Sequence, residues 1–143
     1  MNFTKQEAVR HHRDMWNWIA DELEKHENTY ETIWELKEKF IDINFLPEIL
    51  NDCFCCQYVD SHYYGKWGSP GACKICPLIW GNEEFVGDTC FCEGLSLEDD
   101  ETIDYEKTRG LYGKLIDVLI DEKDFEKGAR LARKIANLPE KLN

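Results

Sequence analysis

Long hydrophobic runs are missing from this chain of 143 residues. No stretch reaches the roughly 20 apolar residues that a membrane-spanning helix needs, and the first residues contain no apolar signal-peptide core. We therefore expect no membrane segment and a cytoplasmic location. Thiols stay reduced in that compartment, and seven cysteines, an odd number, cannot all pair as disulfides. Metal ligands or free thiols are the expected state of these cysteines.

An excess of basic residues is also missing. The chain has 29 acidic and 17 basic side chains and a net charge of −12. Each section is acidic, with 11 acids against 6 bases in residues 1–51, 6 against 2 in residues 52–93 and 12 against 9 in residues 94–143. Proteins that bind nucleic acids gain affinity from Lys and Arg side chains that neutralise phosphates. The composition therefore argues against direct nucleic-acid binding.

Recognisable catalytic motifs are missing as well. The chain has no Gly-rich phosphate loop, no Ser-centred elbow, no His-Glu-x-x-His zinc-protease motif and no His-x-Glu deaminase motif. His11 and His12, beside Arg13 and Asp14, fit a helix face on which one imidazole is packed and the other exposed. We therefore do not expect this protein to be an enzyme.

Helical periodicity is present near both ends of the chain. Thr4 and Glu7 have the spacing of a capping box, and the apolar pattern after them predicts a helix over about 5–26. Two further apolar stripes in residues 96–143, separated by a turn at 121–124, predict an antiparallel helical hairpin that ends at Pro139. The buried face of another helix, after Asn28, should contain Ile33, Trp34, Lys37, Phe40 and Ile41.

Two C-x2-C pairs stand in the middle of the chain. Cys53 and Cys56 form the first pair, Cys73 and Cys76 form the second, and 16 residues separate them. This spacing is typical of a zinc ion held by four thiolates, because each pair can turn both sulfurs toward one ion. Four thiolates leave no open position for water or substrate. The pattern therefore predicts a structural zinc site, with Zn²⁺ organising the loop between the pairs.

Other cysteines leave alternative ligand sets open. Cys90 or Cys92 could replace one of the four thiolates, His62 is a further candidate ligand, and Cys55 adds a thiol beside the first pair. A second metal site could also form from the remaining side chains. Cys55 and one of Cys90 and Cys92 fit buried thiols equally well, since cysteine packs readily in cores. An iron–sulfur cluster also uses four thiolates, and a single C-x2-C pair can act as a redox dithiol.

Turn-forming residues gather in the same region. Residues 52–95 contain six of the nine glycines and two of the four prolines, so no helix longer than a turn or two is expected there. The chain is long enough for one core. We predict a single domain over 1–143, mainly α-helical with a small irregular zinc-knuckle module. Its parts are a helical section 1–51, a zinc-binding module 52–95 and a helical hairpin 96–143.

Aromatic residues are abundant in the loop between the pairs. Tyr63, Tyr64 and Trp67 lie in a stretch rich in glycine, where large rings are hard to bury. Exposed rings on a rigid loop often anchor a partner protein. The competing interpretation is that they fold back over the metal site. Trp16 and Trp34, by contrast, are predicted to be core residues on helix faces.

Four stretches together resemble a group of small cysteine-rich, zinc-ribbon-like proteins encoded by bacteriophages and prophages of Gram-positive bacteria. They are TKQEAVRHHRDMWNWIADE, LNDCFCCQY, CKICPLIWG and ARLARKIANLP, in that order from residue 4 to residue 139. The resemblance covers most of the chain and is weakest over residues 94–121. It implies a phage setting, action inside the host cell and a zinc module, but no particular reaction.

Two functions follow as hypotheses. The first is a non-enzymatic phage accessory protein whose zinc-stiffened loop and helices bind a host or phage protein. The second is an acidic inhibitor of a host defence enzyme or another nucleic-acid-processing enzyme, which would present carboxylates where phosphates normally sit. The aromatic loop favours the first hypothesis, and the charge of −12, spread over all three sections, motivates the second.

Overall fold

The computed structural model describes residues 3–25, 33–47, 54–59, 76–82, 92, 94–95, 101–102 and 104–141. For residues 56 and 57 it describes the backbone alone. The elements are α1 (Lys5–Glu24), α2 (Ile33–Ile43), α3 (Phe54–Val59), α4 (Tyr105–Thr108), α5 (Leu111–Asp117), the π-helical turn η3 (Val118–Glu122) and α6 (Phe125–Ala136). Within the described residues the protein is mainly helical and no strand forms, which confirms the predicted α class.

Helix α1 begins at the predicted cap. The Glu7 amide donates to Thr4 Oγ1 at 3.1 Å, and the Thr4 amide donates to Glu7 Oε1 at 3.0 Å. This reciprocal pair satisfies two donors that a helix start otherwise leaves open. The helix ends at Glu24, two residues before the predicted end near residue 26. Residues 26–32, which include the predicted start at Asn28, lie outside the described part of the chain.

Helix α2 buries most of its predicted face. Ile33, Lys37, Phe40 and Ile41 are all buried. The prediction for Trp34 was wrong, because its side chain is 48% exposed. Position 34 lies at the edge of the buried stripe, and its ring covers the Lys37 ammonium from outside, 4.9 Å from ring centre to Nζ.

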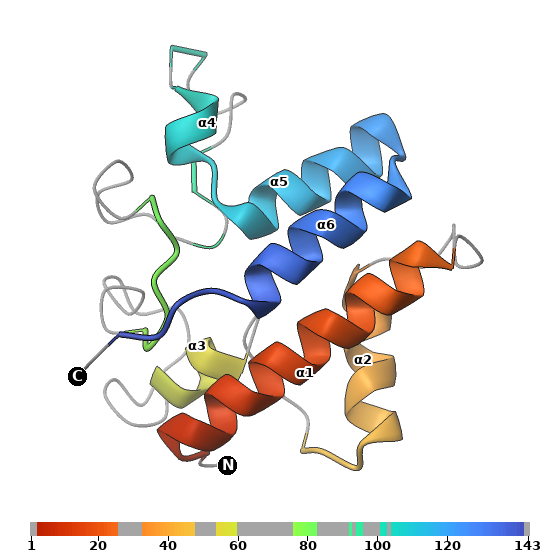
Figure 1. Cartoon of the computed structure of the whole chain (residues 1–143), viewed down its shortest axis with the longest axis vertical. Helices are drawn as coiled ribbons and strands as arrows, with labels where there is room; N and C mark the ends of the chain where they lie inside the picture. Colours follow the sequence, from red (N-terminus) through yellow and green to blue (C-terminus); the bar gives the residue numbers. More distant parts are fainter. Residues whose placement is uncertain are drawn as a thin grey trace.

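The C-terminal hairpin forms between α5 and α6. Figure 1 shows α5, continued by η3, running antiparallel to α6, and the two pack together. The turn is shorter than predicted, since residues 121 and 122 still belong to η3. Lys123 turns the chain with a left-handed φ of 53°, and Asp124 caps α6 by accepting from the Lys127 amide at 3.0 Å.

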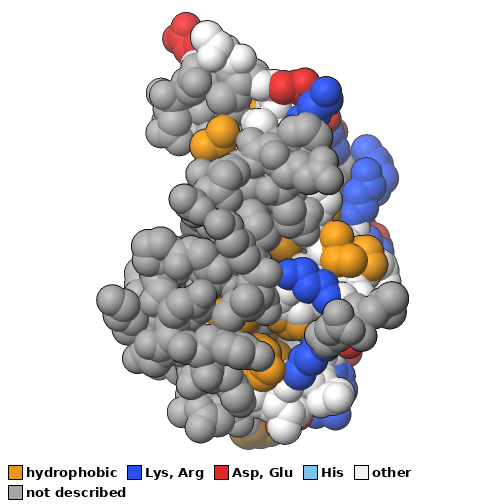
Figure 2. Space-filling model, turned by 90° about the vertical axis from the view of Figure 1, so that its left-hand side faces the viewer, with side chains coloured by type: hydrophobic (Ala, Val, Ile, Leu, Met, Phe, Trp, Pro, Cys, Tyr) orange, Lys and Arg blue, Asp and Glu red, His pale blue; other side chains and the backbone are white. Residues whose placement is uncertain are grey.

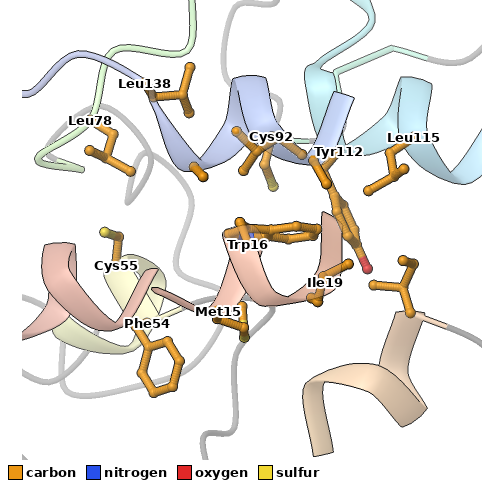
Figure 3. Close-up of a cluster of buried hydrophobic side chains, with 14 of the residues drawn as sticks. Met15, Trp16, Ile19, Phe54, Cys55, Leu78, Cys92, Tyr112, Leu115 and Leu138 are labelled. Carbon is orange, nitrogen blue, oxygen red and sulfur yellow. The ribbon is translucent and has the colours of Figure 1, made fainter. Parts of the chain in front are cut away.

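The hydrophobic core lies between α1 and α6, which pack side by side at the centre of the molecule (Figure 1). Trp16 on α1 is 1% exposed and meets the Tyr112 ring edge-on, with 5.7 Å between ring centres. Figure 3 shows this cluster with Ile19 and Leu115 beside it. Fully burying such side chains contributes about 1.5–3 kcal/mol each. One buried cluster also includes Phe54, Cys76 and Cys92, so described residues of all three predicted sections meet in it.

Candidate functional site

The structure describes part of the predicted metal site. Cys76 is buried, and the backbone of Cys56 lies in α3. Cys53 and Cys73 lie outside the described residues, as do the alternative ligands Cys90 and His62 and the predicted partner-binding residues Tyr63, Tyr64 and Trp67. Among the described residues, no three metal-ligating side chains come together. The four-thiolate site therefore stays a prediction, and the structure shows how the segments around it are held.

Helix α3 holds the end of the first cysteine pair against α1. Phe54 is fully buried, with ring centres 5.5 Å from Phe3, 5.3 Å from His11 and 6.4 Å from Phe40. Cys55 is also fully buried, and its side chain points from α3 toward Leu78 in Figure 3. These contacts fix the short helix that carries Cys56, although α3 has only six residues.

The segment after Cys76 pairs with the chain that follows α6. The Ile79 amide donates to the Pro139 carbonyl at 2.8 Å, and the Lys141 amide donates to the Pro77 carbonyl at 2.8 Å. Leu78, between these bonds, is fully buried. The end of the second cysteine pair is thus attached to the C-terminal end of α6.

His12 connects α1 to both of these regions. Its Nε2 lies 2.9 Å from the Ile135 carbonyl, and its ring meets the Trp80 ring edge-on at 6.1 Å. Because a carbonyl only accepts hydrogen bonds, Nε2 is the donor in this contact. Nδ1 is buried without a hydrogen-bond donor. The His12 imidazole therefore packs α6 and the segment after Cys76 against one position of α1.

Arg13 makes the second connection from the same turn of α1. Its guanidinium donates to the Ala136 carbonyl at 3.2 Å and to the Leu138 carbonyl at 3.1 Å. The Ala136 carbonyl belongs to the last residue of α6, where helix carbonyls lack partners within the helix, and Leu138 follows two residues later. Residues 11–13 therefore hold α3, the segment 76–82 and the end of α6 together, and we call them the α1 junction. The sequence predicted one packed and one exposed imidazole here; His12 is buried and His11 is half-buried, and no pattern indicated that three segments meet there.

Cys92 is bonded through its backbone to the start of α5, away from the α1 junction. Its carbonyl accepts from the amides of Tyr112 at 2.9 Å and Gly113 at 3.2 Å, at the start of α5. Gly94 then forms an isolated bridge with Arg109. The side chains of Cys92 and Cys55 are both buried in the core, as is that of Cys76, so burial leaves their predicted roles as packed thiols or metal ligands open.

A cavity of about 260 Å³ opens near the start of α5, and no pattern in the sequence predicts it. Its basic side chains are compensated by acids. Arg109 binds the Asp117 carboxylate through Nε at 3.0 Å and Nη2 at 3.1 Å, and Lys114 Nζ lies 3.5 Å from Glu106 Oε2. The residues that line the cavity include Trp80, Asn82, Glu106, Arg109, Leu111 and Lys114.

Comparisons with known proteins add no assignment. The chain matches no family model, no curated protein and no solved structure. The resemblance to phage-encoded cysteine-rich proteins therefore stays a prediction. Within the described residues, none of the helices combines the length and the apolar character that crossing a bilayer requires.

Proposed function

We propose that this chain is a non-enzymatic accessory protein of bacteriophages of Gram-positive bacteria, that it acts in the host cytoplasm, and that it binds a host or phage protein. A structural zinc ion, held by Cys53, Cys56, Cys73 and Cys76, would order the segment that makes the contact. The proposal combines the cysteine spacing, the aromatic loop and the resemblance in the sequence with the packing of the described residues.

The α1 junction is the observation that supports the proposal most directly. Helix α3 contains Cys56, and Cys76 directly precedes the segment bonded to residues 139 and 141. Both regions pack on consecutive residues of one helix turn through Phe54 and Trp80. A scaffold that holds one end of each pair would lower the entropy cost of ordering the loop when zinc binds.

The metal is tested by elemental analysis of the purified chain. We expect about one zinc per chain, lost in Cys53→Ser and Cys73→Ser. Cobalt substitution should give the visible spectrum of a tetrahedral thiolate site. Cys92→Ser is the control, because retained zinc supports the simplest ligand set and lost zinc supports the set that includes Cys92. A wild-type chain without metal, or with Cys53 and Cys73 in disulfides, would refute the structural zinc.

Partner binding is tested separately by affinity purification from infected host cells. We expect one saturable partner for the wild-type chain. Replacing Tyr63, Tyr64 and Trp67 together by alanine should remove it while the zinc content stays unchanged. A chain that keeps its zinc and binds no partner above background would contradict the binding function and leave the metal site intact.

The acidic inhibitor remains the second proposal, motivated by the net charge of −12. A phosphate mimic needs a continuous acidic stripe. Several described acids are instead paired with bases, as in Arg133 with Asp21 and Glu24, and Lys127 with Glu122. Figure 2 shows Lys and Arg side chains interspersed with acidic and hydrophobic ones over the described part of one face. These observations favour the binding protein over the mimic.

A further inference from the structure

The turn after α2 has an unusual residue at its tightest point. Phe45 adopts a φ of 54°, in the left-handed region. Its amide donates to the Asp42 carbonyl at 3.3 Å, and the next amide, of Leu46, reaches back to the Ile41 carbonyl at 3.0 Å. These two bonds form the Schellman motif, which ends many helices and places one residue in the left-handed conformation.

Glycine usually occupies this position, because a Cβ atom makes the left-handed conformation unfavourable. Phenylalanine there is strained, and the fold gains nothing visible from its ring, since Phe45 is 95% exposed. The neighbour Leu46 already supplies the apolar contact of the motif by packing against the core. Strain kept at an exposed residue points to a role outside folding.

Ile43 extends the same apolar surface. It is 59% exposed and lies two residues before Phe45, and we call these two exposed apolar residues the apolar tip. Figure 1 shows the turn after α2 at the outer edge of the molecule, at the bottom of the view. The tip therefore projects where another molecule can reach it.

Acidic side chains lie along one face of α2, as far as the residues just before the apolar tip. Glu35, Glu38 and Asp42 are all exposed and follow the i, i+3, i+7 spacing of one helix face. Lys39 is the one exposed base of α2, so this face is acidic overall. A surface of this charge attracts a basic partner and repels an acidic one.

We propose that the apolar tip is an anchor that inserts into an apolar pocket of a partner protein, and that Lys and Arg side chains surround that pocket. This inference rests on the proposed binding function and adds a second contact surface to it. The acidic face disfavours a second copy of this chain, whose net charge is also −12, and disfavours an anionic membrane surface.

The test places a photo-crosslinking phenylalanine analogue at position 45 of the full chain in Gram-positive bacterial cells, with position 120 as the control. Ile120 is another exposed apolar residue, 68% exposed, in η3. We expect a protein adduct from position 45 and none from position 120. The captured protein, purified alone, should bind the wild-type chain in a direct affinity measurement.

Substitutions then separate a docking role from a structural one. Phe45→Gly should weaken affinity for the purified partner by at least about 30-fold, the range of an interface hot spot. It should also raise the unfolding midpoint, by about 3 °C, because glycine relieves the strain. Phe45→Trp should keep binding, and Asp42→Lys should slow association and reduce its dependence on salt.

Four results would overturn the inference: dimers of the wild-type chain that Phe45→Gly dissolves, binding to vesicles of anionic lipid, unchanged affinity of Phe45→Gly for the purified partner, or no adduct at position 45. If a partner binds and depends on Trp67 but not on Phe45, the apolar tip fails while the proposed binding function stands. If the wild-type chain captures no partner, by crosslinking from position 45 or by affinity purification, both fail.

Discussion

The ammonium group of Lys37 lies 4.4 Å from the centre of the Tyr112 ring, 75 residues further along the chain. The same Nζ donates to the Tyr112 hydroxyl at 3.4 Å and lies 5.4 Å from the Trp16 ring and 4.9 Å from the Trp34 ring. Lys37 is only 1% exposed. Aromatic faces attract a cation, and most strongly where water is excluded. Trp16 on α1 and Tyr112 on α5 thus help to hold α2 in place through Lys37, and Trp34 on α2 itself covers the ammonium.

Lys37→Met should lower the free energy of unfolding by about 1–2 kcal/mol, because methionine keeps an apolar stem but loses the attraction of the rings. Chemical denaturation measures the change. Lys39→Met, on the exposed side of the same helix, is the control and should change stability by less than about 0.5 kcal/mol. If Lys37→Met is as stable as the wild type or more stable, the free-energy cost of desolvating the ammonium equals or exceeds the stabilisation that the rings provide.

Helix ends and helix faces could be predicted from the sequence because their signals are local. Thr4 and Glu7 define the start of α1 from a spacing of three residues, and the reciprocal bonds confirm it. Trp34 shows the limit of periodicity, which gives the centre of a buried stripe but not its edge. Phe45 shows another limit, since its left-handed turn occurs at a residue type that gives no sign of one.

Of the candidate site, only the cysteine spacing gives a signal within a short stretch of sequence. The spacing of Cys73 and Cys76 indicates a metal ligand pair without reference to the fold. The contact between His12 and Ile135, by contrast, joins residues 123 positions apart, and Arg13 reaches Leu138 over 125 positions. No pattern within a short window encodes such a separation. The α1 junction therefore became visible only once the helices were packed.

Substitutions at two glycines, Gly94 and Gly81, test how closely residue 94 packs on the backbone of residues 108–110. Both have positive φ, 69° and 94°. A Cβ at Gly94 would lie 2.0 Å from the Thr108 carbonyl oxygen, whereas a Cβ at Gly81 meets nothing within 4 Å. Gly94→Ala should therefore cost about 3 kcal/mol or more, and Gly81→Ala only about 1 kcal/mol of backbone strain. Thermal unfolding compares the stabilities of the two variants. Similar losses of stability in both would contradict the close approach at residue 94.

His11 should titrate below its usual pKa of 6.5. Burial lowers the pKa first, and the nearby Arg10 guanidinium lowers it further. Since the folded chain then binds this proton less readily than the unfolded chain, His11 opposes folding only as the pH falls below 6.5 and has no effect well above it. An NMR titration, assigned with His11→Gln, measures the pKa, and Arg10→Gln should raise it. A value at or above 6.5 in the wild-type chain would contradict this environment.

Arg13→Met tests the α1 junction. The substitution keeps the apolar stem and removes two charged hydrogen bonds to the end of α6, so the free energy of unfolding should fall by about 2 kcal/mol. Arg10→Met, on the exposed face of α1, should change it by less than about 0.5 kcal/mol. Because residues 139 and 141 position the segment after Cys76, we also expect weaker zinc binding in competition with a chelator. A loss of stability with unchanged zinc affinity would mean that the junction serves the helices alone.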